Sequence, residues 1–223
     1  MELLPKLVGD VITTPRRNIS GSYFIPEHKW VILKKVNECP TTISQKDFED
    51  GMGPAFTAGK YRCRLAGAGN ENKFALMRIY KQIPLEGTRL DSARERQNQA
   101  CPPRKHTEVE ALLHLTEIRS AAVPEVRGYQ TSKQEADDLV PGGYIIYLVW
   151  EEVSGCSLDP EYFWGVPYNK RQAIRENFKK AFSEVIGAGY QPVPSDPAKI
   201  IVNKDTNDVY VLRCLLQPHA NDA

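Results

Sequence analysis

Hydrophobic and polar residues alternate in the first third of the chain in a way that predicts β-strands. Residues 29–33 (Lys-Trp-Val-Ile-Leu) form one strand candidate, and residues 60–65 (Lys-Tyr-Arg-Cys-Arg-Leu) alternate as a half-buried strand does. A third candidate covers residues 73–80. Because the glycine-rich stretch 67–70 between the last two predicts a turn, we expect these two strands to form an antiparallel hairpin.

The middle of the chain predicts a helix followed by two strands. The helix begins either at Pro103, where proline suits the first helical position, or at Thr107, which has a capping-box partner in Glu110. Residues 126–130 form the next strand candidate. Residues 144–150 are the most hydrophobic run of the chain, which is typical of a central strand buried on both faces.

The last third of the chain predicts one long amphipathic helix and a short hairpin. Asn169 is a candidate N-cap, and the helix extends to residue 189. Its apolar residues recur at helical spacing on one face: Ile174, Phe178, Ala181, Phe182, Val185 and Ile186. Residues 200–202 and 209–212 form the hairpin, and residues 84–106 predict a long polar loop. Strands followed by segregated helices indicate the α+β class.

Composition and charge are those of an ordinary globular protein. The chain has 223 residues, enough for one large domain or two small lobes, with 41% hydrophobic and 26% charged residues. The formal net charge of +1 gives no global attraction to nucleic acid or to an anionic membrane. No apolar run reaches the ~20 residues of a membrane span, and no signal-peptide pattern opens the sequence. We therefore expect a cytoplasmic or nuclear protein.

The sequence contains no pattern of metal-binding residues. The five cysteines are scattered, without the spacing of a metal knuckle: Cys39, Cys63, Cys101, Cys156 and Cys214. The four histidines form no metal-binding or triad spacing either. We therefore predict no metal site.

Three segments carry a resemblance to the protein-kinase fold, including choline and aminoglycoside kinases, over residues 50–215. Residues 148–158 (Leu-Val-Trp-Glu-Glu-Val-Ser-Gly-Cys-Ser-Leu) are similar to the fifth strand and hinge of kinases. In residues 75–80, Arg78 takes the place of the kinase strand lysine, as in choline kinases. The helix that carries Glu108 is similar to the kinase C-helix with its ion-pairing glutamate.

The resemblance implies a two-lobe architecture. Residues 1–50 are then an N-terminal extension, and residues 51–153 form a kinase-like small lobe with an antiparallel sheet. Residues 154–223 form a truncated, helical large lobe, because the chain stops about ten residues after the last hairpin.

The resemblance also implies a nucleotide or ligand cleft. Its residues are Gly51, Gly53, Arg78, Glu108, Trp150, Glu151 and Val153. Each main feature has two possible roles. Gly51 and Gly53 either cover phosphates or form a plain turn. Arg78 and Glu108 form an ion pair at a nucleotide or a purely structural pair. Trp150 occupies the kinase gatekeeper position or is a plain core residue.

Three departures from the kinase pattern fall on its catalytic residues. Pro194 stands at the catalytic Asp position, Lys199 at the metal-binding Asn position and Arg213 at the metal-binding Asp position. Magnesium is held by carboxylate and amide oxygens, so two cations there oppose its binding. The side chain of Pro194 cannot accept a proton from a substrate hydroxyl. If the match to the kinase catalytic loop is shifted by two residues, Asp196 takes that position and is a candidate base. Lys199 and Arg213 form a metal-free anion site or are two solvated charges.

These observations leave three functional hypotheses. The first is a pseudokinase that acts as a binding or scaffolding module, with a protein partner or a second copy on its incompletely covered large lobe. The second is a repurposed kinase-fold enzyme that binds a small metabolite between the lobes, for example in a biosynthetic pathway. The third is an eroded gene fragment. We predict no cofactor, and binding of ATP without metal is the alternative left open.

Overall fold

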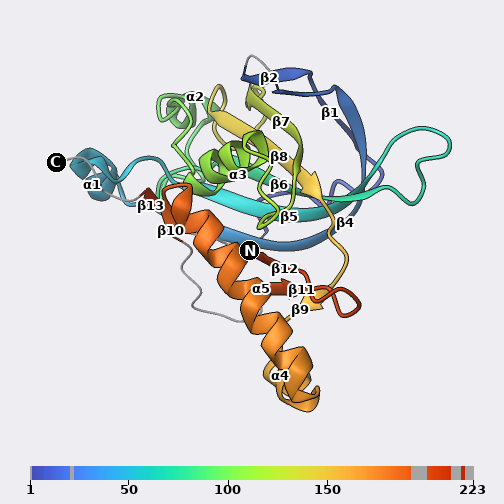
Figure 1. Cartoon of the computed structure of the whole chain (residues 1–223). Coiled ribbons are helices and arrows are strands. Elements are labelled where there is room, and N and C mark those ends of the chain that lie inside the picture. The colour runs from blue at the N-terminus through green and yellow to red at the C-terminus, as the bar shows by residue number, and fades with distance from the viewer. Residues whose placement is uncertain (1, 21–22, 192–199, 212–216, 219–223) are drawn as a thin grey trace. The chain divides into compact units, whose positions relative to one another are not determined.

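The chain forms a mixed α/β structure with an antiparallel sheet, as expected (Figure 1). The computed structural model describes residues 2–20, 23–191, 200–211 and 217–218. The chain divides into two compact units. We call Met1–Arg104 with Arg127–Glu151 the sheet unit, and Lys105–Val126 with Glu152–Ala223 the helical unit.

A six-stranded sheet dominates the sheet unit, in the order β1-β4-β5-β6-β8-β7. The neighbouring pairs β1–β4, β4–β5, β5–β6 and β6–β8 are all antiparallel. The predicted strands and hairpin are present, most of them longer than predicted, and the N-terminal residues contribute β1 and β4. The bounds are β1 Val11–Thr14, β4 His28–Thr41, β5 Phe56–Leu65, β6 Phe74–Gln82, β7 Val126–Lys133 and β8 Tyr144–Glu151.

Smaller elements complete the sheet unit. A short hairpin joins β2 (Arg17–Ser20) to β3 (Tyr23–Ile25). Two helical turns, α1 (Gln45–Asp47) and η1 (Phe48–Met52), connect β4 to β5. Helix α2 (Ala93–Gln97) lies within the segment predicted as a loop.

One face of the sheet carries the main hydrophobic core. Burial alternates along β5 with a period of two, so Tyr61 and Cys63 point to the core and are fully buried. Met77 and Val149 continue the same layer from β6 and β8. The core cluster consists of Leu4, Trp30, Ile32, Tyr61, Cys63, Ala75, Met77, Ile79 and Val149.

The two outermost strands of the sheet approach each other around this core. A Cβ atom at Gly128 of β7 would lie 2.5 Å from the Oγ1 of Thr14 on β1. That hydroxyl also accepts a hydrogen bond from the indole Nε1 of Trp30 at 3.0 Å. His28 Nδ1 lies 3.0 Å from the carbonyl oxygen of Arg127, which joins β4 to β7. The sheet therefore curls until its edges meet, and glycine at 128 makes the closest approach sterically possible.

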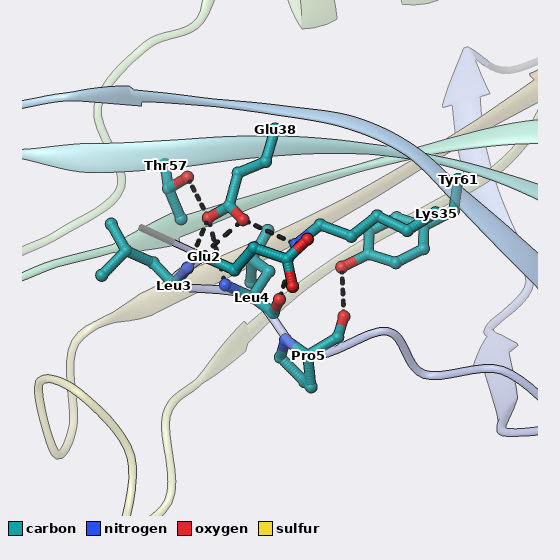
Figure 2. A network of polar contacts seen from close by, with 8 residues as sticks. All are labelled: Glu2, Leu3, Leu4, Pro5, Lys35, Glu38, Thr57 and Tyr61. Carbon is teal, nitrogen blue, oxygen red and sulfur yellow. Dashed lines mark hydrogen bonds and ion pairs between the residues drawn. The ribbon is translucent and has the colours of Figure 1, made fainter.

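Glu38 holds the N-terminal residues against the sheet (Figure 2). Its carboxylate accepts hydrogen bonds from the backbone N–H groups of Leu3 and Leu4, each at 3.0 Å, and from the hydroxyl of Thr57 at 2.7 Å. The ammonium group of Lys35 lies 2.6 Å from the same carboxylate. The Glu38 side chain is only 6% exposed, so charge-assisted hydrogen bonds of this kind are strong.

Three further contacts fix the same segment. The Tyr61 hydroxyl donates to the carbonyl oxygen of Pro5 at 2.8 Å, and Lys35 donates to the carbonyl oxygen of Leu4 at 2.7 Å (Figure 2). The Leu4 side chain packs where Gly59 leaves space, because a Cβ at 59 would lie 2.6 Å from its Cδ1. The segment thus covers part of the core face.

The helical unit is built around one long helix, α5 (Tyr168–Gly187). Its inward residues Ile174, Ala181 and Val185 are buried, as the predicted apolar face requires. Strands β9, β11 and β12 form a three-stranded antiparallel sheet, and β10 pairs with β13. The remaining bounds are α3 Thr107–Glu117, α4 Pro160–Gly165, β9 Cys156–Ser157, β10 Tyr190–Gln191, β11 Ile200–Val202, β12 Val209–Val211 and β13 Gln217–Pro218.

Both predicted helix caps are wrong. Helix α3 is capped by His106 without a side-chain bond, so Thr107 already lies inside the first turn and cannot cap it. Helix α5 follows Pro167, so Asn169 is inside the helix as well. A true capping box lies at α2, where Ser92 and Glu95 exchange hydrogen bonds.

We predict that Gly128→Ala destabilises the protein by about 1–3 kcal/mol, because the new methyl group collides with Thr14 and forces the sheet edges apart. Gly187→Ala is the matched control, since no atom lies within 4 Å of its Cβ position. Urea unfolding of both variants measures the difference. Equal free energies of unfolding would contradict the proposed closure.

We also predict that the stabilisation due to Glu38 disappears at acid pH. Burial opposes ionisation, but hydrogen bonds from Lys35, Thr57 and the Leu3 N–H outweigh it and hold the pKa of Glu38 below its ordinary value. The contribution is therefore complete above the unfolded pKa of about 4.3 and is lost as the pH falls through the lower folded pKa.

Glu38→Gln measures this contribution. We expect the variant to be about 1–3 kcal/mol less stable than the wild type at pH 7, with a gap that narrows below about pH 4. Urea midpoints between pH 7 and pH 3 give the gap. A constant difference over that range would show that the charge of Glu38 does not anchor the segment.

Candidate functional site

Two of the predicted cleft residues, Arg78 and Trp150, lie together on the sheet face opposite the core. Arg78 of β6 is paired with Leu148 of β8 on one side and with Lys60 of β5 on the other. The guanidinium carbon of Arg78 is 5.6 Å, and the ammonium nitrogen of Lys60 6.0 Å, from the centre of the Trp150 ring. Trp150 is itself buried although it lies on the face opposite the main core cluster, and its ring is a shared cation–π partner of both cations.

Further cations continue this face. Arg62 lies two residues along β5 from Lys60, pairs with Lys34 of β4, and has its guanidinium 4.1 Å from the Phe74 ring centre. We call this surface the basic–aromatic face; it consists of Lys34, Lys60, Arg62, Phe74, Arg78 and Trp150. Neighbouring ammonium and guanidinium groups are the donors that proteins use to hold phosphate and carboxylate groups.

Sequence reasoning missed Lys60 and Arg62, although a signal for them was present. The alternation in residues 60–65 was used only to predict a strand. The same period of two places every second residue on one face, and antiparallel pairing with β6 then brings Lys60 beside Arg78.

Gly51 and Gly53 belong to the turn between β4 and β5. Their φ angles are 86° and 81°, in the region that favours glycine. Arg104 donates a hydrogen bond to the carbonyl oxygen of Met52 at 3.2 Å, which braces the turn. The backbone conformation of the turn therefore explains why glycine occupies both positions, and no ligand is needed to explain it.

The other predicted cleft residues lie in different surroundings. Glu151, at the end of β8, forms an ion pair with Arg127 at 2.9 Å, and both side chains are more than a third exposed. Such surface pairs contribute little to stability. Half-buried Val153 and Glu108 belong to the helical unit, with Glu108 in the first turn of α3. The pairing of Glu108 with Arg78 stays a prediction.

The positions to which the kinase resemblance assigns roles in phosphoryl transfer lie outside the described residues. These are Pro194, Asp196, Lys199 and Arg213. Within the part of the chain that the structure describes, no group of three His, Cys, Asp or Glu side chains is placed to hold a metal ion. No helix in that part is long and apolar enough to cross a membrane.

A second unusual surface lies at the junction of α4 and α5. The side chains of Trp164 and Tyr168 are 64% and 66% exposed. Arg171 lies between them, its guanidinium 5.6 Å and 5.9 Å from the two ring centres, and donates to the carbonyl oxygens of Trp164 and Val166. Two large aromatic rings therefore lie beside one guanidinium group while they face solvent.

The sequence explains why this junction forms. Asp159 accepts a hydrogen bond from the N–H of Tyr162 at 2.7 Å, and Pro160 occupies the first turn of α4. Pro167 separates α4 from α5. Phe163 packs edge-on against Trp164, and the guanidinium of Arg175 lies 5.0 Å from the Phe163 ring centre. We call Phe163, Trp164, Tyr168, Arg171 and Arg175 the aromatic patch.

Comparison with known proteins shows distant similarity to solved structures and no match in sequence. No protein-family model matches the chain, and no curated protein does. Among solved structures, the chain is similar to the kinase PK-1 of Cydia pomonella granulovirus, with 10% sequence identity and a TM-score of 0.47. The match covers 85% of this chain and 52% of the viral chain, so this chain spans about half the length of that kinase.

Proposed function

We propose that the chain is a degenerate protein-kinase-like domain that acts as a binding or scaffolding module and does not transfer phosphate. The order of its elements supports the kinase-like class. Strands β5 and β6, helix α3, strands β7 and β8, helix α5 and the hairpin β11–β12 follow one another as the resemblance in sequence implies.

The proposed loss of chemistry rests on the sequence. Phosphoryl transfer depends on positioned donors, metal ions and a residue that accepts or orients the nucleophile. Pro194, Lys199 and Arg213 stand where a kinase-like chain needs an acid, an amide and an acid. The positive φ angles of Gly51 and Gly53 explain these two glycines as turn residues, so they are not evidence for a phosphate-binding loop.

The aromatic patch is the observation that carries the binding role. Single exposed apolar side chains are ordinary at a protein surface, whereas neighbouring exposed aromatic rings are typical of interaction sites. Trp, Tyr and Arg are also the residues most often found at the energetic centre of protein interfaces. Arg171 restrains both rings in advance, which lowers the entropy lost on binding.

We propose a second copy of the chain as the occupant of the patch. The patch contains both aromatic rings and guanidinium groups, so a two-fold contact could pair the cations of one copy with the rings of the other. A self-complementary surface of this kind supports a homodimer over a partner of single charge.

The loss of phosphoryl chemistry predicts no magnesium-dependent response to ATP. Thermal unfolding is measured with ATP alone, with Mg²⁺ alone and with both. We expect the shift in midpoint with both ligands to equal the sum of the separate shifts, because two cations stand at the metal-ligand positions. A clear additional stabilisation by Mg²⁺·ATP would contradict the proposal.

The aromatic patch predicts a concentration-dependent dimer. Light scattering of the purified chain measures the mass, and Trp164→Ser with Tyr168→Ser is expected to raise the dimer dissociation constant at least tenfold. Leu90→Ser is the matched control, because Leu90 is 97% exposed and lies outside the patch. A wild-type monomer at high concentration, or an equal effect of the control, would exclude the homodimer.

A further inference from the structure

A cavity lies in the sheet unit, between the chain that follows α2 and the connection from β7 to β8. Its volume is about 680 Å³, within the range of sites that hold small molecules. The lining residues are Gln97, Ala100, Cys101, Pro102, Pro103, Thr131, Ser132, Lys133, Pro141, Gly142 and Tyr144. Tyr144 and Trp150 are six residues apart on β8, so about 20 Å of strand separates the cavity from the Trp150 ring.

Two buried glutamines hold the walls of this cavity from behind. Gln82 donates to the carbonyl oxygen of Gln99 at 2.7 Å and accepts from the N–H of Cys101 at 3.3 Å. Gln134 donates to the carbonyl oxygens of Gln82 and Tyr144 at 2.9 Å and 3.1 Å. Gln82 and Gln134 are only 2% and 5% exposed, so their amides cross-link the two wall segments. Because these bonds hold the wall segments in place before a ligand binds, little conformational entropy of the protein is lost on binding.

The lining defines the chemistry of the ligand. Apolar groups make most of the wall: the rings of Pro102, Pro103 and Pro141, the methyl group of Ala100 and the ring of Tyr144. Thr131 and Ser132 also line the cavity, and the hydroxyl of Thr131 donates a hydrogen bond to the hydroxyl of Tyr129 at 3.1 Å. Of the lining residues, Lys133 alone carries a formal charge, and none is acidic. Burial raises the pKa of the Cys101 thiol, so the thiol is neutral at physiological pH.

We infer that this cavity binds a small ligand with an apolar body and one anionic group. The prolines and Tyr144 contact the apolar body, and the ammonium group of Lys133 pairs with the anion. This site is independent of the proposed function, because it needs neither the aromatic patch nor any kinase position.

The test uses 1-anilinonaphthalene-8-sulfonate, an aromatic probe with one sulfonate, and the whole chain. We expect saturable one-to-one binding by fluorescence, which Lys133→Glu weakens at least fivefold. Ala100→Leu, which places a larger apolar side chain in the wall without changing charge, is expected to weaken binding as well. Lys73→Glu is the matched charge control, because Lys73 is exposed and outside the lining.

A second measurement locates the bound probe. Alkylation of each thiol by iodoacetamide is followed by peptide mass spectrometry, with exposed Cys39 as the internal reference. We expect saturating probe to slow the alkylation of Cys101 at least threefold and to leave Cys39 unchanged. The inference is overturned if no saturable binding occurs, if Lys133→Glu and Lys73→Glu weaken binding equally, or if Cys101 is not protected.

Discussion

The sheet unit depends on the closure of its sheet, which brings β1 against β7 at Thr14 and Gly128. An open six-stranded sheet would leave one face of its core facing solvent and two edges free to pair with other chains. Here the bend encloses Trp30, Tyr61 and Met77 within one layer. The hydrogen bond from Trp30 to Thr14 ties the interior of the sheet to the same closing contact.

Much of this fold was predictable, because long elements repeat their signal. Residues 144–150 and the apolar face of residues 169–189 each carry many side chains that agree on one structure. Short helices such as α2 and α4 have too few residues to show an apolar periodicity. Their capping residues and prolines alone do not distinguish them from a polar loop. Helix α3 does begin at Thr107, one of its two predicted starts, and α5 begins one residue before Asn169, but neither residue is the cap. One polar side chain therefore locates the start of a helix only to within a residue or two.

The candidate site was only partly predictable from sequence. Arg78 and Trp150 were found through the kinase resemblance, whereas Lys60 needed the pairing register that a strand prediction does not supply. The aromatic patch was harder still. Aromatic residues in a helix usually indicate burial, and only packing reveals that Trp164 and Tyr168 face solvent.

The anchoring of the N-terminal segment has a consequence for how this sequence can diverge. Glu38 grips the main-chain N–H groups of Leu3 and Leu4, which every residue except proline possesses. The bond to Glu38 thus places no demand on the side chain at position 3, although Leu3 also packs against the cluster that contains Ile43 and Ile83. The side chain of Leu4 fills the space that Gly59 leaves. A relative with a larger residue at 59 should carry a smaller one at 4, so these two positions are expected to covary while Glu38 stays constant.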